Sequence, residues 1–421
     1  MKILVLCPHY HPDVAPTGVV MTRLVDELAD RGHQLEVVTS LPWYREHRIE
    51  PGWEGRLVRT EKMRWGRLVR VYPFPGGDRS SLIARALSFA GFTALAGLRT
   101  ILARGRFDLV LAMSPPLTLG LPAWVAARLR RVPFVFNVQD VFPDVAVEVG
   151  ALSSRQVIAV FAALERHVYR TSDAVTVLSD DLRQNLVQKI RSRPGRGGST
   201  DKIRVIPNFV DTDHIAVQDR QNSYRDEYDL GDRTVVMYAG NVGFSQSLDL
   251  LTEAARRLAH RDDVVFVVNG GGSAIDQVAE EARDLPNVVL APLQPRERLP
   301  EVLAAADIHT VLLKAGLAKA SVPSKTYSVL AAGRPVVASV DAGTEVTRML
   351  QDSAGGVSVD PGDPDAFVDA LVSLIDDSER RAAMGRAGRE WVADAASPAA
   401  IAAAYEVLFE ELIAGRGPGQ A

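Results

Sequence analysis

Cysteine is almost absent from this sequence, because Cys7 stands alone among 421 residues. One cysteine cannot form an intramolecular disulfide, so a small secreted fold stapled by disulfides is excluded. The residues that open the chain also lack the long apolar core and the small-residue cleavage site of a signal peptide. We therefore expect a cytoplasmic protein.

Long uncharged apolar runs are scarce as well. The stretch 86–98 lies between Arg85 and Arg99 and is interrupted by Gly91 and Gly97. A membrane-spanning helix requires roughly 20 predominantly apolar residues. We therefore expect that this stretch does not cross a bilayer.

An excess of positive charge is absent too, since 48 Lys and Arg face 52 Asp and Glu, for a formal charge of -4. This balance argues against nucleic-acid binding driven by overall charge. The segment 41–106 nevertheless holds thirteen Lys or Arg against five acids. Six large aromatic residues lie among them: Trp43, Trp53, Trp65, Phe74, Phe89 and Phe92. The combination favours contact with an anionic membrane surface, and a solvated basic face with ordinary core aromatics is the alternative.

What is present is an alternation of short β-branched or apolar runs with longer helical patterns. Such alternation is typical of parallel sheets covered by helices on both faces. The first part predicts strands at 2–7, 34–39, 109–113, 133–138 and 174–178, and helices at 19–29, 121–129 and 155–169. After a short strand at 203–207 the pattern restarts, with strands at 234–239, 264–269, 288–291, 308–313 and 336–339 and helices at 248–260, 275–283, 298–305 and 325–332.

These patterns predict an α/β protein with two doubly wound, Rossmann-like domains, at 1–205 and 206–395. A last helix at about 396–415 is expected to pack back onto the first domain, and 191–200 is expected to be an exposed loop. Ligands of such sheets bind beyond the carboxyl ends of the strands. The Gly-x-Gly-x-x-Gly and P-loop patterns are missing there, which argues against a dehydrogenase or an NTPase.

A series of strings in a fixed order makes a family resemblance specific. They are Cys7-Pro8-His9-Tyr10-His11-Pro12, Thr17-Gly18, Arg31-Gly32-His33, Glu165, Ser172 to Ser179, Val205 to Asp211, Tyr238 to Gly243, Ala304 to Asp307, Pro323 to Tyr327, Ala331 to Ala338 and Gly343 to Val346. Together they resemble the retaining glycosyltransferases of family four, over nearly the whole chain. The resemblance is greatest to the branch that acts in colanic acid, capsule and O-antigen assembly. It implies the GT-B fold, in which two Rossmann-like domains face each other across a cleft.

The resemblance also implies an activity. The protein is expected to move a hexosyl or N-acetylhexosaminyl group from a nucleotide-sugar donor, bound mostly by the second domain, to an acceptor on the first. With the basic aromatic segment it suggests a saccharide or polyprenyl-diphosphate-saccharide acceptor at the inner face of the cell membrane, where the protein would be peripheral. No cofactor is expected. Two alternatives stay open: a nucleotide-sugar 2-epimerase on the same fold, and a non-catalytic nucleotide-sugar-binding protein.

Transfer from a nucleotide sugar requires groups that stabilise the departing diphosphate, where negative charge accumulates. Gly18 precedes a predicted helix, the stretch 240–243 forms a turn after a strand, and 321–324 precede another helix. Backbone amides at such places can bind phosphate. We therefore expect these three places to contact the donor, although each could be a structural turn.

The chain departs from the family pattern where charge would be expected. Many members carry an Arg and a Lys in the loop after the first strand of the second domain, and the matching residues here are the neutral Asn241 and Gln246. Lys325, at a helix start, is the predicted catalytic substitute, because its full charge adds to the amide dipoles. Three further cations stand behind it: Arg334, Lys314 and Lys319.

The family pattern of two glutamates separated by seven residues is missing as well, with Ala320 and Ser328 at the matching positions. Glu345 is predicted to reach the donor, and the alternative is an acid that interacts with a helix dipole. The donor-binding candidates as a set are Gly18, Gly240, Asn241, Gly243, Gln246, Gly271, Pro323, Ser324 and Ser328.

On the acceptor side, Gln139 and Asp140 stand where family members often place a catalytic His. Asp140 is our candidate for orienting or deprotonating the acceptor hydroxyl, with Asp144 as second choice and an Asx turn as the alternative. Four residues are predicted to contact the acceptor: His9, His11, Asn137 and Gln139. The string Asp211-Thr212-Asp213 imitates an Asp-x-Asp metal motif, but its place between the domains favours a turn. No metal site is expected.

Overall fold

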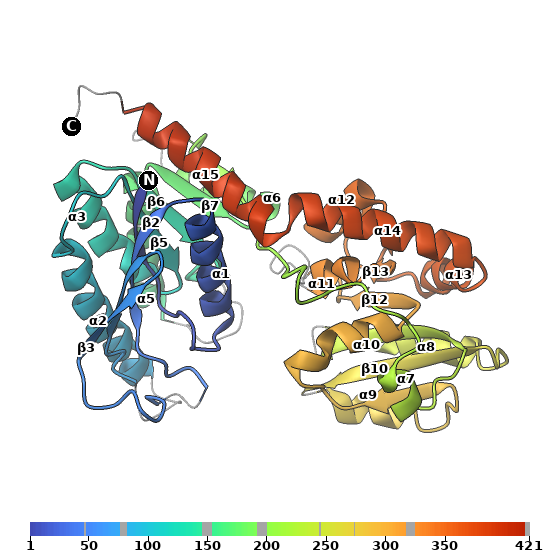
Figure 1. The fold of residues 1–421 in the computed structure, drawn as a ribbon. Coiled ribbons are helices and arrows are strands. Elements are labelled where there is room, and N and C mark those ends of the chain that lie inside the picture. Colours follow the sequence, from blue (N-terminus) through green and yellow to red (C-terminus); the bar gives the residue numbers. More distant parts are fainter. Residues whose placement is uncertain are drawn as a thin grey trace. The chain divides into compact units, whose positions relative to one another are not determined.

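A computed structural model describes residues 1–45, 48–75, 82–144, 154–191, 200–243, 246–272, 274–316 and 325–416, without the side chains of 82–89. The chain forms two compact units, with Met1–Asn208 and Ile401–Ala421 in the first unit and Phe209–Ala400 in the second (Figure 1). The sequence placed the boundary at 205 and 206. Each unit is built around its own sheet, which is parallel apart from one edge strand of the first unit.

The first unit contains an eight-stranded sheet in the order β3-β4-β2-β1-β5-β6-β7-β8. Its strands are β1 (Lys2–Leu6), β2 (Gln34–Ser40), β3 (Val58–Met63), β4 (Gly66–Val71), β5 (Leu109–Ser114), β6 (Phe134–Val138), β7 (Ala174–Val177) and β8 (Ile203–Val205). All neighbours pair in parallel except β3 and β4. The apolar runs that predicted β1, β5 and β6 are buried along their length, as strands covered on both faces must be.

Helices cover both faces of this sheet. They are α1 (Pro16–Asp30), α2 (Leu82–Ile101), α3 (Gly120–Arg130), α5 (Arg155–Thr171), α6 (Asp180–Arg191) and the carboxyl-terminal α15 (Pro398–Ala414), with a 3-10 turn at Leu117–Leu119. Figure 1 shows α1 on one face and α2 with α3 on the other. Tyr405 and Phe409 of α15 are buried, so α15 belongs to the core of this unit.

The edge hairpin of β3 and β4 did not emerge from the sequence, because its charged residues obscure the alternation. Arg70 is 2% exposed and its Nε donates to Glu61 at 3.0 Å. Arg67 donates to Glu36 at 2.7 Å. Trp65 and Phe92 lie in the core. Part of the basic aromatic segment 41–106 is therefore structural rather than surface.

Cys7 follows β1 and is completely buried. Removal from water raises the pKa of its thiol to about 12. The thiol is therefore almost entirely protonated at neutral pH, and Cys7 is a small apolar core residue.

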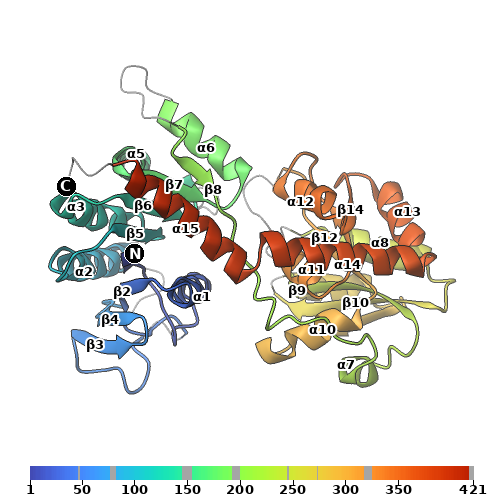
Figure 2. The same cartoon turned by 45° about the horizontal axis from the view of Figure 1, so that its top comes forward.

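The second unit contains a six-stranded parallel sheet in the order β11-β10-β9-β12-β13-β14 (Figure 2). Its strands are β9 (Thr234–Asn241), β10 (Val264–Gly271), β11 (Val288–Ala291), β12 (Ile308–Leu312), β13 (Val336–Ser339) and β14 (Gly356–Val359). Its helices are α7 (Ser223–Glu227), α8 (Asp249–Arg257), α9 (Ile275–Glu281), α10 (Leu299–Ala305), α11 (Lys325–Ala331), α12 (Glu345–Ser353), α13 (Pro364–Ile375) and α14 (Ser378–Ala395), with a 3-10 turn at Arg296–Arg298. The first sheet face is packed by α8, α9 and α13, and the second by α10, α11, α12 and α14.

The helical stretch Ser378–Ala414 is long and apolar enough to cross a membrane, judged by length and composition only. It consists of two helices, because α14 ends at Ala395 and α15 begins at Pro398. The first packs on α11 and α12, and the second packs in the core of the first unit. These contacts are typical of core helices.

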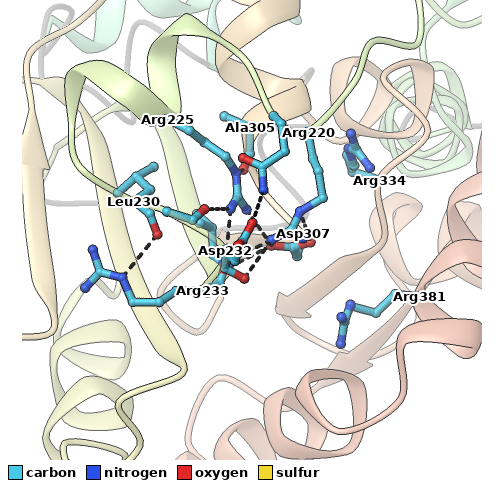
Figure 3. Close-up of polar contacts among 12 residues, drawn as sticks. Arg220, Arg225, Leu230, Asp232, Arg233, Ala305, Asp307, Arg334 and Arg381 are labelled. Atoms are coloured by element: carbon cyan, nitrogen blue, oxygen red, sulfur yellow. Dashed lines mark hydrogen bonds and ion pairs between the residues drawn. The ribbon is translucent and has the colours of Figure 1, made fainter.

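A buried ion network fastens the beginning of the second unit to the amino edge of its sheet (Figure 3). Arg225 is 1% exposed, and it donates to Asp307 at 2.7 Å and to the carbonyl of Ala305 at 2.8 Å. Asp307 also accepts from the Val235 amide, at the start of β9. Arg334 lies beside this cluster, just before β13. It is therefore at the amino edge, and its predicted role as a reserve cation for the donor phosphates is corrected.

The string Asp211-Thr212-Asp213 forms a turn. Asp211 Oδ1 accepts from the backbone amides of Asp213 at 3.2 Å and His214 at 3.0 Å. This is the side-chain to backbone pattern that aspartate makes in turns. The interpretation as a turn is confirmed.

Candidate active site

The order of the second sheet contains a topological switch point between β9 and β12. The chain leaves β9 through α8 toward β10 on one side, whereas β12 continues to β13 on the other. In open α/β sheets, ligands bind beyond the carboxyl ends of the strands at this point. The predicted residues Gly240 and Asn241 end β9 at this edge, Gly243 lies in the loop that follows, and Lys325 begins α11.

Lys325 lies at the switch point and reaches back over β9. Its Nζ donates to the Tyr238 hydroxyl at 2.7 Å and lies 4.0 Å from the centre of the Tyr238 ring. The hydroxyl in turn donates to the carbonyl of Asn241 at 2.6 Å. Burial lowers the pKa of Lys325 to about 8. Within the described part of the chain Lys325 has no carboxylate partner, so its charge is available for an anion.

The end of β9 and the loop after it contain two glycines and the two neutral residues that stand where many family members carry cations. Gly240 has a φ of 139°, and a Cβ there would lie 3.5 Å from Lys325 Nζ. The Gly243 amide donates to Gln246 Oε1 at 2.9 Å. Gln246 therefore holds the loop in place instead of supplying charge.

Two further donor candidates, Gly271 and Ser328, also lie at this edge. Gly271 ends β10, and a Cβ there would meet nothing within 4 Å. Ser328 lies one turn along α11 from Lys325 and is half-buried. A cavity of about 200 Å³ is lined by Gly243, Gln246 and Lys314 among others, so the reserve cation Lys314 lies at the same loop. The predicted residues Pro323 and Ser324, with the rest of 321–324, Lys319 and Ala320, lie outside the described residues.

Glu345 begins α12, beyond the carboxyl end of β13. Its carboxylate pairs with Arg348 at 3.0 Å, and Arg348 donates to the carbonyl of Gly343 at 2.7 Å. Glu345 thus lies on the ligand-binding edge of the sheet and is already part of an ion pair. A donor hydroxyl that bound Glu345 would have to share it with Arg348.

In the first unit, the loop after β1 carries His9 in a fixed orientation. His9 Nδ1 bonds to Asp13 Oδ2 at 2.7 Å, and Asp13 Oδ1 accepts from the Tyr44 amide at 3.1 Å. The His9 ring stacks on Trp43 with centres 5.7 Å apart. Because Nδ1 is bound to Asp13, Nε2 is the ring nitrogen that can meet a ligand.

His11 is exposed, and its hydrogen bonds to other described residues are made by its backbone. Its amide donates to Thr22 Oγ1 at 2.9 Å, and its carbonyl accepts from the buried Arg70. Arg70 therefore ties the edge hairpin to the loop that carries both candidate histidines.

Gly18 lies in the first turn of α1 and packs directly against His9. A Cβ at Gly18 would approach His9 Cβ to 2.9 Å and the carbonyl of Asp13 to 3.4 Å. We expect Gly18→Ala to lower the free energy of unfolding by about 1–3 kcal/mol, because the loop must move to admit the methyl group. Urea unfolding measures this. Gly362→Ala is the control, since a Cβ there meets nothing, and equal losses in both variants would contradict the predicted crowding.

Asn137 and Gln139, predicted to contact the acceptor, are instead buried in a chain of hydrogen bonds. Asn137 Nδ2 donates to the hydroxyls of Tyr405 at 2.8 Å and Thr176 at 3.0 Å, and its Oδ1 accepts from Gln139 Nε2 at 2.8 Å. Gln139 Oε1 accepts from Asn208 at 2.8 Å. Asn137 is 2% exposed and Gln139 8%. For both residues this placement replaces the predicted acceptor contact with a structural one, the fastening of β6 to α15 and to the chain at 208.

Asp140 follows this chain at the end of β6 and is exposed. Partial desolvation raises the pKa of its carboxyl group. No described residue forms a hydrogen bond or ion pair with it. Asp144, the second choice, is instead bound by Lys189 at 2.8 Å and Asn185 at 3.1 Å. The geometry therefore favours Asp140 as the carboxylate that can meet an acceptor hydroxyl.

Two residues that position the site were missed from the sequence. Asp13 orients His9, and Tyr238 holds Lys325. Both lie within strings that the resemblance had singled out or adjoin them, but only the fold shows which partner each one contacts.

Comparison with known families decides the identity of the chain. Residues 17–208 match the family described as glycosyl transferase 4-like domain, and residues 233–377 match glycosyl transferases group 1. The chain is a family-four glycosyltransferase. Both the α/β GT-B fold and the enzyme class expected from the sequence are confirmed.

Relatives of this glycosyltransferase match it over most of their length. Escherichia coli WcaI, named as a colanic acid biosynthesis glycosyl transferase, is 27% identical over 87% of this chain and 90% of its own. A GDP-mannose-dependent alpha-(1-6)-phosphatidylinositol monomannoside mannosyltransferase of Mycolicibacterium smegmatis is 29% identical over 66% of this chain and 78% of its own. The solved structure of Anabaena Alr3699/HepE in complex with UDP covers 98% of this chain and 100% of its own, with 14% identity and a TM-score of 0.66. The glycosyltransferase thus shares its fold with that protein.

Proposed function

We propose that this glycosyltransferase moves a sugar, with retention of anomeric configuration, from a nucleoside-diphosphate sugar to a lipid-linked saccharide in cell-surface polysaccharide biosynthesis. One observation carries the donor side: the half-buried Lys325, which has no carboxylate partner among the described residues, lies at the switch point of the second sheet near Gly240. Such a cation stabilises the negative charge that develops on a departing diphosphate. The names of the relatives support the acceptor class, since one acts on a phosphatidylinositol mannoside and another is assigned to colanic acid.

The candidate groups divide the reaction between the units. In the second unit Lys325 and the amides around Gly240 would hold the diphosphate as the bond to the sugar breaks. In the first unit Asp140 would orient the acceptor hydroxyl or take its proton, which a partly desolvated carboxylate does well because its pKa is raised. His9 would contact the acceptor through Nε2. No metal or cofactor is assigned a role.

The test begins with the donor. Thermal shift measurements with UDP, GDP and ADP identify the nucleotide, and its sugars are then offered with and without polyprenyl-diphosphate saccharides. Acceptor-dependent transfer with an unchanged anomeric configuration in the NMR spectrum of the product supports the proposal. Turnover without acceptor to a free epimeric nucleotide sugar would identify a 2-epimerase, and binding without turnover would identify a binding protein. Either of these two outcomes would overturn the proposed transfer reaction.

Membrane contact is a separate part of the proposal. The segment 41–106 exposes Leu57 by 62% and Phe74 by 39%, and it contains thirteen Lys or Arg. Such a surface is attracted to anionic lipids. We expect the protein to float with phosphatidylglycerol vesicles but not with phosphatidylcholine vesicles. If it associates with neither, the proposed membrane contact is wrong.

Nucleotide binding should depend on pH through Lys325. Its pKa of about 8 means that the ammonium is largely charged at pH 7 and largely neutral at pH 9. Only the charged form attracts a diphosphate, so we expect about tenfold weaker binding of the chosen nucleotide at pH 9 than at pH 7. Isothermal titration at both values measures this. Lys325→Arg should abolish the decline, because a guanidinium group stays charged at both pH values. Equal affinities of the wild type at pH 7 and 9 would contradict the assignment.

A further inference from the structure

A second cavity lies in the first unit, at the edge opposite to the carboxyl ends of the strands. It has a volume of about 380 Å³ and is lined by residues 105–108 and 130–133, just before β5 and β6, together with Ile413 and Arg416. The candidate histidine loop and Asp140 follow the carboxyl ends of β1 and β6. The cavity is therefore separate from the catalytic groups of this unit.

The charge of the lining is strongly positive. Among the described residues that line it, Arg106, Arg130, Arg131 and Arg416 contribute guanidinium groups and Asp108 contributes a carboxylate. Asp108 Oδ2 is already bound by the amide of Lys2 at 2.7 Å, and Arg416 pairs with Asp173 at 2.6 Å. The exposed side chains of Arg106 and Arg131 have no hydrogen bond or ion pair with any residue in the described ranges.

Arg130 and Arg131 both stand at the carboxyl end of α3, but only Arg130 has recognised side-chain hydrogen bonds to helix-end carbonyls within the described ranges. Arg130 donates to the carbonyls of Ile101 at 3.0 Å, Ala103 at 2.6 Å and Ala126 at 3.1 Å, where α2 ends and α3 makes its last turns. Cations at this place stabilise helix ends. Arg130 thus lies in the wall of the cavity with its donors occupied by backbone carbonyls. The guanidinium donors of Arg106 and Arg131 have no such partner among the described residues.

We propose that this cavity binds a phosphate group, with Arg106 and Arg131 as its ligands. Planar guanidinium groups bind phosphate oxygens with two parallel hydrogen bonds, and two of them in one cavity hold it firmly. The phosphate can belong to a soluble phosphorylated compound or to a lipid headgroup. Leu102 and Leu129, exposed by 62% and 68%, do not line the cavity, but they adjoin Ala103 and Arg130 in sequence and offer apolar surface to acyl chains. The inference does not depend on the proposed reaction.

The test compares two double variants with equal net charge. Arg106→Gln with Arg131→Gln removes the free cations, whereas Arg104→Gln with Arg128→Gln removes two exposed arginines from the same turns that do not line the cavity. Isothermal titration with inorganic phosphate is expected to show about tenfold or greater loss of affinity in the first variant only. Phosphate bound elsewhere, including at the nucleotide site, contributes equally to both variants. Melting curves check that both are folded.

Vesicle flotation distinguishes the two sources. Loss of binding to phosphatidylglycerol vesicles in the first variant, with binding kept in the second, identifies a lipid headgroup. Loss of phosphate affinity without any effect on flotation identifies a soluble phosphate compound. If both variants weaken equally, or if the wild type neither binds phosphate nor floats, the cavity is not a phosphate site. Neither outcome bears on transfer itself, which the donor and acceptor assays measure.

Discussion

Lys325→Met should lower kcat/KM for transfer by about 10²–10³, the range seen when a preorganised group that stabilises transition-state charge is removed. The methionine keeps the length and apolar body of the side chain and removes only the charge. In this chain no arginine or lysine stands at positions 241 and 246, so the loss cannot be made up there. Steady-state kinetics with the donor selected by thermal shift measures the effect.

The controls for this variant separate charge from packing. Lys62→Met removes an exposed lysine on β3 and should leave the kinetics unchanged. Lys325→Arg keeps the charge but cannot fit the contact with Tyr238 in the same way, so an intermediate rate is expected. Full activity of Lys325→Met would mean that another cation neutralises the diphosphate.

Asp140→Asn should lower kcat by about 10²–10⁴, the usual contribution of a general base, while nucleotide affinity stays the same. The amide has the same shape and cannot take a proton. Asp140 is not among the groups assigned to the donor phosphates, so nucleotide affinity should not depend on its charge. Steady-state rates of this variant at saturating acceptor measure the loss of kcat. Nucleotide titration of the same variant measures whether the affinity is unchanged.

Two other aspartates serve as controls for Asp140. Asp180→Asn changes an exposed carboxylate at the start of α6 and should have no kinetic effect. Asp144→Asn weakens the bond to Lys189, which also binds the buried Glu165, so it should reduce stability rather than the chemical step. If Asp140→Asn turns over like the wild type, the carboxylate is not the base, and His9 becomes the next candidate.

The periodicity of the sequence was sufficient for most of the sheet, because strands buried on both faces have nearly continuous apolar runs. The predicted 288–291 and 336–339 coincide with β11 and β13. The periodicity did not predict β3 and β4. There the buried Arg70 forms an ion pair with Glu61, and no local sequence pattern indicates that ion pair. Burial of a charged side chain depends on a partner, and the sequence does not show partners.

For the candidate site, the sequence likewise indicated some of the residues but not the contacts that they make. Lys325 followed from the resemblance, but its position over Tyr238 depends on the adjacency of β9 and the start of α11, 87 residues apart. Asn137 was assigned to the acceptor from its place at a strand end, and the contact that consumes its amide comes from Tyr405, 268 residues away. The prediction that Arg334 is a reserve cation for the donor phosphates was wrong for a geometric reason. It follows α11, and a helix of one or two turns returns the chain to the opposite edge of the sheet.

The burial of Cys7 has a practical consequence for studies of motion. A thiol that is enclosed and protonated at neutral pH reacts hardly at all with maleimides. Fluorophores can therefore be attached to one engineered cysteine in each unit of the otherwise native chain. Energy transfer between the two dyes would then follow how the units move as donor and acceptor bind.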